Sequence, residues 1–367
     1  MRRAGKTILT KRALAEINND EERSFNCDLP SVAKRCADPE QLLKALPPGI
    51  VVFDEVHQLP DPSRLLKIAA DQFPELKVLA TGSSPLAATD KFRDSLTGRK
   101  RQVHLTPVLY EELASFDVRN LRLWLLRGGL PQALLGKSLD ASFYSEWLDS
   151  YFARDIQALF RVEKRTQFLR LLEATLRLSG GATTTQTPAT LTGPSRPTLG
   201  NYLGVLETTL GLRIVHPHYG GHIFELVRQP RLYGFDTSFI CHARGIESLR
   251  DEDCGSLWEH LILDSLHTHF PSKEVCYWRG KQDHEVDFVM RGCGNEMHAI
   301  ECNWQADAFE GKSMLKFRHL YPEGKNVLIA PNAVSGLTST YKSIQIEQCV
   351  LEKLPSLLAK AKTPPAI

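Results

Sequence analysis

Runs of apolar residues and helically spaced apolar residues alternate in the first part of the chain. Residues 50–53 are four consecutive apolar residues, mostly β-branched, without the alternation of a half-exposed strand. Such a run is typical of a strand buried on both faces, as in a parallel sheet covered by helices. Residues 76–80 predict a second buried strand, and residues 5–17 and 63–73 have the spacing of helices. This order predicts a doubly wound α/β domain.

One more helix of this region is predicted from its start signals. Asp38 stands at the N-cap position, Pro39 follows at the first helical position, and Gln41 is placed for a capping box. We expect this helix to run to about Leu46. It should stop at the Pro-Pro-Gly turn directly before the strand at residues 50–53.

The remainder of the chain predicts three further regions. Residues 110–167 have a mostly helical pattern. Helices at residues 168–177 and 198–208 and a strand at residues 212–216 then predict a winged helix-turn-helix with a β-ribbon. The last third predicts a separate α/β domain, with helices at residues 255–270 and 309–317 and strands at residues 274–278, 285–290, 297–303 and 326–330.

Composition adds little to this picture. A chain of 367 residues with 42% hydrophobic and 24% charged residues has room for two or three ordinary globular domains. A net charge of +2 neither requires nor excludes a nucleic-acid partner. Eight cysteines without a C-x-x-C pair favour reduced thiols, and no apolar run has membrane-spanning length. These features predict a soluble cytoplasmic protein without a membrane partner.

A phosphate-binding motif is present in part at the start of the chain. Such a loop uses glycines to wrap backbone N–H groups around phosphates, a lysine for the β- and γ-phosphates, and a hydroxyl for Mg²⁺. Gly5, Lys6 and Thr7 supply the second half of G-x-x-x-x-G-K-[ST]. The first glycine would fall one position before Met1, and the strand that normally carries the loop is missing. Either the true start lies upstream, or the nucleotide site has lost part of its loop.

Two carboxylates follow the apolar run at residues 50–53. Ligands of open α/β sheets bind beyond the carboxyl ends of the strands, which is where Asp54 and Glu55 lie. In a nucleoside triphosphatase the first carboxylate holds Mg²⁺ or its water shell, and the second accepts the proton of the attacking water. The alternative is a buried strand followed by a solvated acidic turn.

Polar residues follow the next predicted strand as well. Thr81 or Ser83 is placed to sense the γ-phosphate or to orient water. Arg99, in the sequence Ser-Leu-Thr-Gly-Arg, is a candidate arginine finger, because a guanidinium stabilises charge on the transferring phosphoryl group. The alternative for Arg99 is an ordinary solvated surface arginine.

An ordered series of short motifs carries a family resemblance. The chain resembles the prokaryotic AAA-like ATPases that have a winged-helix segment and a C-terminal domain of unknown function. This resemblance implies ATP binding with Mg²⁺, ATP hydrolysis and a restriction-endonuclease-like C-terminal fold. The motifs are R-R-A-G-K-T, F-D-E-V-H-Q-L-P, L-A-T-G-S-S, S-L-T-G-R, R-G-G-L-P, F-A-R-D-I, R-L-Y-G-F-D, G-S-L-W-E, W-R and E-V-D-F.

With the resemblance, the expected fold class is α/β and the expected domains are four. Residues 1–117 form an AAA-like P-loop core with a parallel sheet, and residues 118–165 form a helical linker or lid. Residues 166–235 form the winged helix-turn-helix, and residues 236–360 form a degenerate restriction-endonuclease-like domain.

The last domain offers candidate residues for a nuclease site. Nucleases of this fold hold Mg²⁺ with acidic residues on two neighbouring strands, and a lysine two positions after the second acid positions the nucleophile. Asp287 and Glu301 occupy the acidic positions, and Glu259 is a possible third. Asn303 stands at the lysine position and carries no charge. We therefore expect a fold retained for binding or assembly, with metal-dependent cleavage as the alternative.

The partner predictions rest on local charge and on the resemblance. Basic residues near the winged helix could contact the phosphates of double-stranded DNA, mainly through electrostatics. The alternative is a solvated surface or a protein-binding module. AAA-like sites commonly lie between subunits, so the resemblance implies a homo-oligomer. The basic residues are Arg161, Lys164, Arg165, Arg170, Arg177 and Arg196.

These expectations combine into one leading function. ATP bound with Mg²⁺, and its hydrolysis, would control the arrangement of the winged helix and the nuclease-like domain. The alternative is a non-catalytic DNA- or protein-binding module with a vestigial ATPase site, which the incomplete phosphate loop favours.

Overall fold

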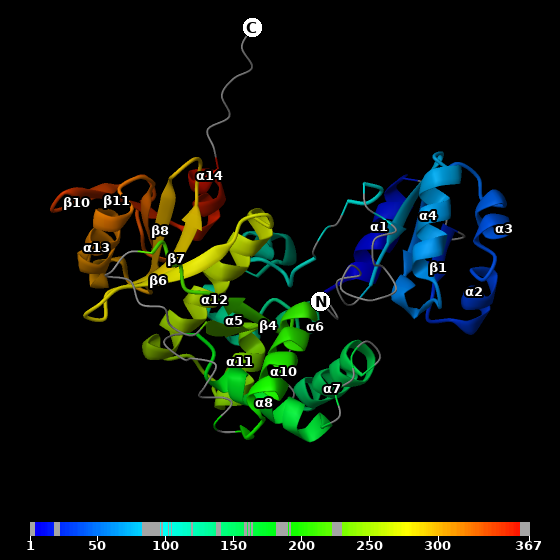
Figure 1. Cartoon of the computed structure of the whole chain (residues 1–367), viewed down its shortest axis with the longest axis horizontal. Coiled ribbons are helices and arrows are strands. Elements are labelled where there is room, and N and C mark those ends of the chain that lie inside the picture. Colours follow the sequence, from blue (N-terminus) through cyan, green and yellow to red (C-terminus); the bar gives the residue numbers. More distant parts are fainter. Residues whose placement is uncertain are drawn as a thin grey trace, which may run out of the picture. The chain divides into compact units, whose positions relative to one another are not determined.

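The chain divides into two compact units, and Figure 1 labels its helices and strands. The first comprises Met1–Leu105, Ser145–Arg165 and Asn201–Gly211, and the second Thr106–Tyr144, Thr166–Gly200 and Leu212–Ile367. A computed structural model describes residues 4–17, 23–82, 96, 98–101, 103, 105–118, 120–136, 141–157, 160, 162, 164–180, 190, 192–221 and 230–359.

The first unit holds a parallel sheet of three strands in the order β1-β2-β3. Strand β2 (Gly49–Asp54) lies between β1 (Ser24–Asn26) and β3 (Leu76–Ala80). A central strand has neighbours on both edges and helices on its faces, which explains why its apolar run does not alternate. The helices of this region are α1 (Lys6–Ile17), α2 (Pro30–Arg35), α3 (Pro39–Lys44) and α4 (Pro62–Gln72).

Strand β3 begins and ends where the sequence predicts, but the expectation of a buried strand is wrong. Only Leu76 is buried, Lys77 is exposed, and Leu79 is 41% exposed. The physical reason is its place at the edge of the sheet: among the described strands it pairs with β2 alone. Strand β1 was not predicted, because three residues are too short for a periodic signal.

Two aspartates start helices as the sequence chemistry requires. The Asp38 carboxylate accepts the backbone N–H of Gln41 at 3.1 Å and caps α3. Asp61 accepts the N–H of Arg64 at 3.0 Å and caps α4, after a 3₁₀ turn at Val56–Gln58. Each cap satisfies a backbone donor that the first helical turn leaves unpaired.

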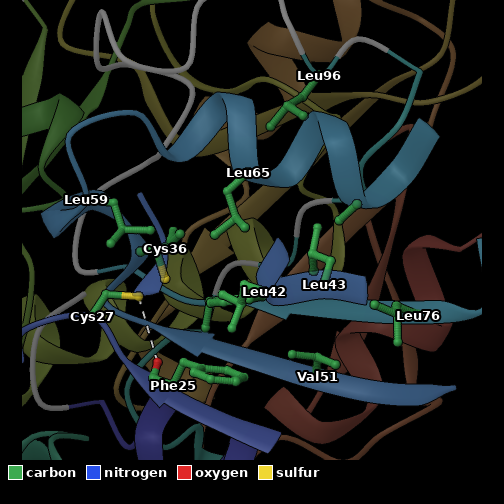
Figure 2. Close-up of a cluster of buried hydrophobic side chains, with 13 residues drawn as sticks. Phe25, Cys27, Cys36, Leu42, Leu43, Val51, Leu59, Leu65, Leu76 and Leu96 are labelled. Carbon is green, nitrogen blue, oxygen red and sulfur yellow. Dashed lines mark hydrogen bonds between the residues drawn. The ribbon is translucent and has the colours of Figure 1, made fainter. Parts of the chain in front are cut away.

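The core of this unit lies between the sheet and helices α2, α3 and α4 (Figure 2). The rings of Phe25 and Phe53 stack with centroids 5.2 Å apart. Burying each such side chain contributes ~1.5–3 kcal/mol. Cys27 and Cys36 are also in the cluster, and the Cys27 thiol donates to the Phe25 carbonyl at 3.8 Å. Helix α2, which ends next to Cys36, has no buried residue of its own.

A second part of the first unit comes from the middle of the chain. Helix α7 (Ala141–Tyr151) continues into a π-helical turn at Phe152–Ile156. Tyr151 and Thr209, at the end of α10 (Arg196–Thr208), share a hydrogen bond of 2.5 Å between their hydroxyls. Trp147 and Tyr151 are buried and stacked, so the aromatic residues of α7 serve packing.

The second unit begins with helical segments and a two-stranded ribbon. Strands β4 (Leu212–Val215) and β5 (Arg231–Gly234) pair antiparallel after two helices, in the order predicted for a winged helix. Assignment to that fold remains a prediction. The remaining elements here are the 3₁₀ segment Tyr110–Phe116 and helices α5 (Leu121–Arg127), α6 (Pro131–Leu134), α8 (Arg165–Arg177) and α11 (Thr237–Arg244).

One joint of the second unit explains two of the sequence motifs. The buried Asp236 carboxylate accepts the N–H groups of Gly129 at 2.9 Å and Leu130 at 3.3 Å. Gly128 adopts a φ of +69°, and a Cβ there would collide with that carboxylate. These hydrogen bonds therefore join the R-G-G-L-P turn to the aspartate of R-L-Y-G-F-D.

A six-stranded mixed sheet forms the rest of the second unit, in the order β10-β11-β9-β8-β7-β6. Strands β10 and β11 were not predicted, whereas the other four were. Its classification as restriction-endonuclease-like remains a prediction. The strands are β6 (Val275–Arg279), β7 (Glu285–Arg291), β8 (Met297–Cys302), β9 (Asn326–Ile329), β10 (Thr338–Tyr341) and β11 (Ile344–Cys349), and the helices are α12 (Asp251–His269), α13 (Lys312–Leu320) and α14 (Leu354–Leu358).

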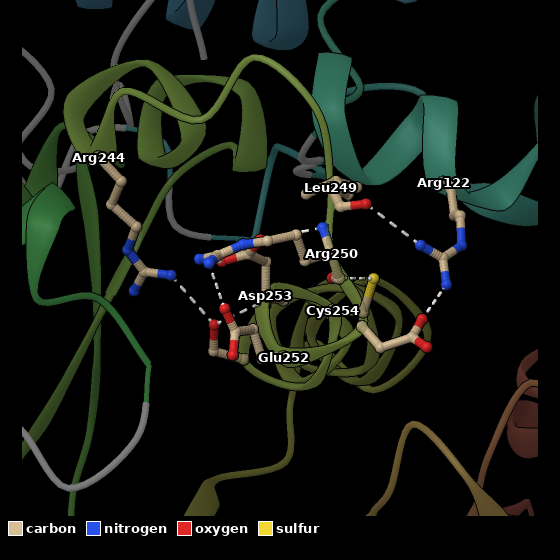
Figure 3. Close-up of polar contacts among 9 residues, drawn as sticks. Arg122, Arg244, Leu249, Arg250, Glu252, Asp253 and Cys254 are labelled. Carbon is tan, nitrogen blue, oxygen red and sulfur yellow. Dashed lines mark hydrogen bonds and ion pairs between the residues drawn. The ribbon is translucent and has the colours of Figure 1, made fainter.

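Helix α12 begins four residues before its predicted start because charged residues organise its first turn (Figure 3). The Asp253 carboxylate accepts the backbone N–H of Arg250 at 3.0 Å. Arg122 from α5 forms an ion pair with Asp251, and Arg244 from α11 donates to Ser256 at 3.1 Å. Within the described residues, no helix is both long and apolar enough to cross a membrane.

Candidate nucleotide site and carboxylate cluster

Asp54 is the centre of the predicted nucleotide site. Thr7, from the first turn of α1, donates its hydroxyl to Asp54 Oδ2 at 2.7 Å. Thr81, just after β3, donates its hydroxyl to Asp54 Oδ1. The Asp54 side chain is buried, with 7% of the residue exposed. Three predicted residues from three separate segments therefore meet at one carboxylate.

Backbone hydrogen bonds hold these segments together. Thr81 donates its N–H to the Phe53 carbonyl at 2.9 Å, and Val56 donates its N–H to the Thr81 carbonyl at 2.9 Å. Helix α1 begins at the same edge, since Thr7 reaches Asp54. The N-terminus of a helix carries unpaired N–H groups and partial positive charge, which favours phosphate. The carboxyl edge of the sheet thus combines an acidic centre with a helix start.

Gly5 and Lys6 precede Thr7 in the order that a phosphate loop uses. Gly5 adopts a φ of +94°, which L-residues rarely adopt, so the glycine is required by the backbone. Lys6 is the first residue of α1. Its ammonium lies close enough to Glu55 to lower that carboxyl's pKa, so the basic group and the acidic residues share one region.

Glu55 has an unusual backbone and a perturbed side chain. Its φ of 54° and ψ of 42° place it in the left-handed region, which costs roughly 1–2 kcal/mol for a residue other than glycine. Burial raises the pKa of its carboxyl, and the charges of Asp54, Asp155 and Asp28 raise it further. A carboxylate with raised proton affinity is suited to accept a proton.

His57 is a member of this site to which the sequence assigned no role. Its Nδ1 lies 3.3 Å from Glu55 Oε2, and the residue is 5% exposed. It belongs to the motif F-D-E-V-H-Q-L-P, but the spacing of the motif does not show that the 3₁₀ turn folds the ring back onto Glu55. The histidine holds the carboxylate from one side.

The other two predicted catalytic residues do not join this group. Ser83 lies outside the described residues. Arg99 pairs with Asp71, with Nε and Oδ1 2.6 Å apart and both side chains about two-fifths exposed. Asp71 is in the last turn of α4, and the 11 residues of that helix span ~16 Å away from its start near Glu55. Arg99 is therefore tied to the far end of α4.

The donor set fits Mg²⁺ bound together with phosphates. Mg²⁺ takes oxygen ligands and is usually held by one or two carboxylates, a hydroxyl and the substrate. Thr7 and Asp54 supply such oxygens. Across the parts of the chain that are described, no group of three or more His, Cys, Asp or Glu side chains is arranged to hold a metal ion alone. The site suits a metal that arrives with a nucleotide.

The three predicted acidic residues of the C-terminal domain also come together. Glu259 Oε2 accepts the Tyr233 hydroxyl at 3.2 Å, and Asp287 Oδ2 accepts the N–H of Cys302 at 2.9 Å. Burial raises the pKa of Glu301 well above its ordinary value, and Asp287 and Glu259 add to that shift. We call Glu259, Asp287 and Glu301 the carboxylate cluster.

Arg231 supplies a positive charge to this cluster that the sequence analysis missed. It lies on β5, is 4% exposed, and forms an ion pair with Glu285. Burial lowers its pKa, but Tyr233, Asp287 and Glu259 outweigh that effect and raise it. The signal in the sequence is an arginine beside the apolar strand residues of R-L-Y-G-F-D. Asn303, at the lysine position, donates its backbone N–H to Ile329 at 3.0 Å.

The basic residues proposed for DNA contact have mixed surroundings. Arg165 pairs with Asp149 at 2.6 Å, and Arg177 pairs with Glu173 at 3.2 Å. Lys164, Arg170 and Arg196 are exposed. Arg161 lies outside the described residues. DNA contact remains a prediction.

Comparisons with known families match three successive regions of the chain. The AAA domain family matches residues 1–114. The N-terminal region is AAA-like. Two domains of unknown function match the rest: DUF8612 over residues 118–250 and DUF4143 over residues 254–349. The candidate nucleotide site described above thus lies in the AAA-like region, and all three residues of the carboxylate cluster lie in the DUF4143 region.

Two curated relatives share most of this chain. Uncharacterized proteins of Mycobacterium bovis and Mycobacterium tuberculosis are each 28% identical over 306 residues, which is 80% of this chain. The chain spans 66% of the length of these relatives. A solved half-complex of Thermococcus gammatolerans McrB AAA+ hexamers with bound McrC has 12% identity and a TM-score of 0.23, with 75% of each chain covered.

Proposed function

We propose that the AAA-like region binds ATP together with Mg²⁺ and hydrolyses it. The observation that carries this proposal is the meeting of Thr7 and Thr81 on the Asp54 carboxylate. The match of residues 1–114 to AAA domains supports nucleotide binding. Hydrolysis needs a base as well, and the raised proton affinity of Glu55 supports that role.

Each residue of the site has one task in this proposal. Gly5 and the start of α1 receive phosphate oxygens, and Lys6 places its ammonium on the terminal phosphates. Thr7 and Asp54 would hold Mg²⁺, and the metal would supply positive charge beside the phosphates. Glu55 accepts the proton of the attacking water, and His57 holds the Glu55 carboxylate. Thr81 fixes the orientation of Asp54.

The nucleotide state would control the winged-helix segment and the C-terminal domain. Two continuous helices support this control, because α7 and α10 each contribute residues to both compact units. A change in the first unit can therefore act on helices that continue into the second. Assembly into a homo-oligomer and contact with double-stranded DNA or a protein partner are further parts of this proposal.

The test is Mg²⁺-dependent phosphate release from ATP by the full chain. We expect release by the wild type, with Lys6→Ala losing ATP binding and Glu55→Gln retaining binding but losing turnover. The separate effects follow because Lys6 contacts the substrate whereas Glu55 acts on water. Absence of ATP binding by the wild type would instead support the alternative, a non-catalytic DNA- or protein-binding module with a vestigial ATPase site.

The carboxylate cluster gives a second candidate function, cleavage of DNA with a metal. The nearness of Glu259, Asp287 and Glu301 favours it. The uncharged Asn303 opposes it, and so does the finding that no three acidic side chains of the described residues are arranged to hold a metal ion. Arg231 already neutralises part of the cluster, which favours a binding or assembly role. We expect no cutting of duplex DNA with Mg²⁺ or Mn²⁺. Clean cutting that disappears in Asp287→Ala would establish the nuclease instead.

A further inference from the structure

The F-A-R-D-I motif has no role in the function proposed above. It forms the π-helical turn Phe152–Ile156 that follows α7. Such turns are rare in proteins, and those that do occur often lie at functional sites. Phe152, Asp155 and Ile156 are buried, whereas the Arg154 side chain is 58% exposed. The turn is thus anchored by three residues and presents one arginine.

This turn lies beside the nucleotide site. Asp155 is buried with 1% exposed, and its charge raises the pKa of Glu55. Arg154 Nη1 is 3.7 Å from Asp28 Oδ2. The exposed arginine of the turn therefore lies against the segment that directly follows β1.

The position of Asp28 is fixed independently by the sheet. Asn26, the last residue of β1, is the register partner of Asp54. Cys27 donates its N–H to the Asp54 carbonyl at 2.9 Å. Asp28 follows directly, at the carboxyl edge where α1 begins. An arginine paired with Asp28 is therefore held at the edge that would receive a nucleotide.

Charge at this edge favours a basic residue that can change partners. The acidic groups are Asp28, Asp54, Glu55 and Asp155, whereas Lys6 and Arg154 are basic. A nucleoside triphosphate would bring further negative charge. An exposed ion pair at 3.7 Å is weak, so its exchange for a phosphate costs little. A guanidinium also binds two phosphate oxygens at once, which strengthens the new contact.

We propose that Arg154 is the arginine of the nucleotide site: it leaves Asp28 and binds the terminal phosphate of a nucleoside triphosphate. This inference rests on the proposed ATP binding and adds a residue to it. Arg99, the candidate from the sequence, is bound to Asp71 at the far end of α4. Because α7 runs directly into the turn, and Tyr151 contacts α10, Arg154 would also transmit the presence of the terminal phosphate to the helical segment.

The test compares ATP and ADP binding by calorimetry with Mg²⁺, and phosphate release, in full-chain variants. We expect Arg154→Ala to weaken ATP binding by about 10- to 100-fold, the loss typical of one charged hydrogen-bonded contact, and to leave ADP binding within about twofold. Arg154→Lys should restore part of the ATP affinity. Asp28→Asn should not weaken ATP binding, because it removes only the competing partner.

Arg12→Ala is the matched control, since Arg12 is another exposed arginine of the same unit, on α1, and has no role in the proposed site. It should bind and hydrolyse ATP like the wild type. Equal loss of ATP and ADP affinity in Arg154→Ala, or unchanged turnover in Arg154→Ala with loss in Arg99→Ala, would overturn the inference. Loss of ATP binding in Lys6→Ala would show in those cases that the proposed function still stands. No ATP binding by the wild type would overturn both.

Discussion

The Asp54 carboxylate accepts a hydrogen bond from a threonine hydroxyl on each of its two oxygens. Thr7 and Thr81 each occupy one of its carboxylate oxygens, and Thr81 also accepts the N–H of Glu55 at 3.2 Å. One hydroxyl therefore organises both acidic residues. A site held in this way loses little mobility on binding its ligand, which favours tight and specific binding.

Replacing Thr81 by valine tests this arrangement. The substitution keeps the shape but removes the hydroxyl, so Asp54 and the Glu55 N–H each lose a partner. We expect unfolding in urea to become easier by about 1–3 kcal/mol and phosphate release to fall. The control is Thr175→Val, which removes a buried hydroxyl that donates to Leu171 at 2.8 Å in the second unit. Equal loss of turnover in both variants would contradict the role of Thr81.

Glu55 sets the expected pH dependence of ATP hydrolysis. Burial raises the pKa of its carboxyl above the ordinary value of 4.5, and Lys6 opposes that shift only in part. A base works in its ionised form, so phosphate release should fall as the pH is lowered through this raised pKa. The acidic limb of the pH–rate profile should thus lie above pH 4.5. A limb at or below that value would argue against Glu55 as the base.

At the scale of elements, the sequence predicted most strands of the two larger sheets because their apolar runs are long. Strand β2 and strands β6–β9 were found, whereas β1 has three residues and β10 is exposed at most positions. The exposure of β3 could not be predicted, because it depends on which strands become its neighbours. The pattern of apolar residues in a strand predicts its burial correctly only where neighbouring strands and helices cover that strand.

The site was predictable where chain order fixes it and not where packing fixes it. Asp54 and Thr81 follow from the rule that parallel strands end at one edge of a sheet, and Thr7 follows from the phosphate-loop motif. Arg231 approaches the carboxylate cluster, and Arg154 approaches Asp28, from segments remote in the sequence, on β5 and on the turn after α7. No spacing rule connects such residues to their targets.

Glu301 on β8 lies near Asp287 of β7 and Glu259 of α12. We expect this arrangement to lower the stability of the fold at neutral pH. The folded-state pKa of Glu301 is raised well above 4.5 by burial and by Asp287. A raised carboxyl pKa stabilises the fold below the unfolded pKa, and that contribution is lost as the pH rises. We expect Glu301→Gln to increase the free energy of unfolding by about 1–3 kcal/mol at pH 8, with a smaller gain at pH 4.

Glu310→Gln is the matched control, because Glu310 is an exposed glutamate of the same unit that pairs with Lys312 at 2.9 Å. It should produce no gain at pH 8. Urea unfolding of both variants at the two pH values measures the difference. A Glu301→Gln protein that is less stable than the wild type at pH 8 would mean that the ionised carboxylate is needed.

At the scale of the whole molecule, the two compact units should respond differently to a nucleotide. A ligand present at 100 times its Kd stabilises the folded region that binds it by about 2.7 kcal/mol. With Mg²⁺ and ATP, backbone amide exchange should slow in β2 and the adjacent α1, and should remain unchanged in β8. Lys6→Ala should abolish the slowing. Equal protection of β2 and β8 would instead indicate that the units open together.

The buried thiols of Cys27 and Cys36 allow opening of the nucleotide-binding region to be measured chemically. Of the eight cysteines, Cys293 is exposed and the other seven are buried. A maleimide should therefore label Cys293 rapidly. Labelling of Cys27 and Cys36 should be slow, because it requires α2, which has no buried residue, to separate from the sheet. The labelling rate of Cys27 and Cys36, followed separately from the other buried cysteines by mass spectrometry of their peptides, measures how often the nucleotide-binding region opens.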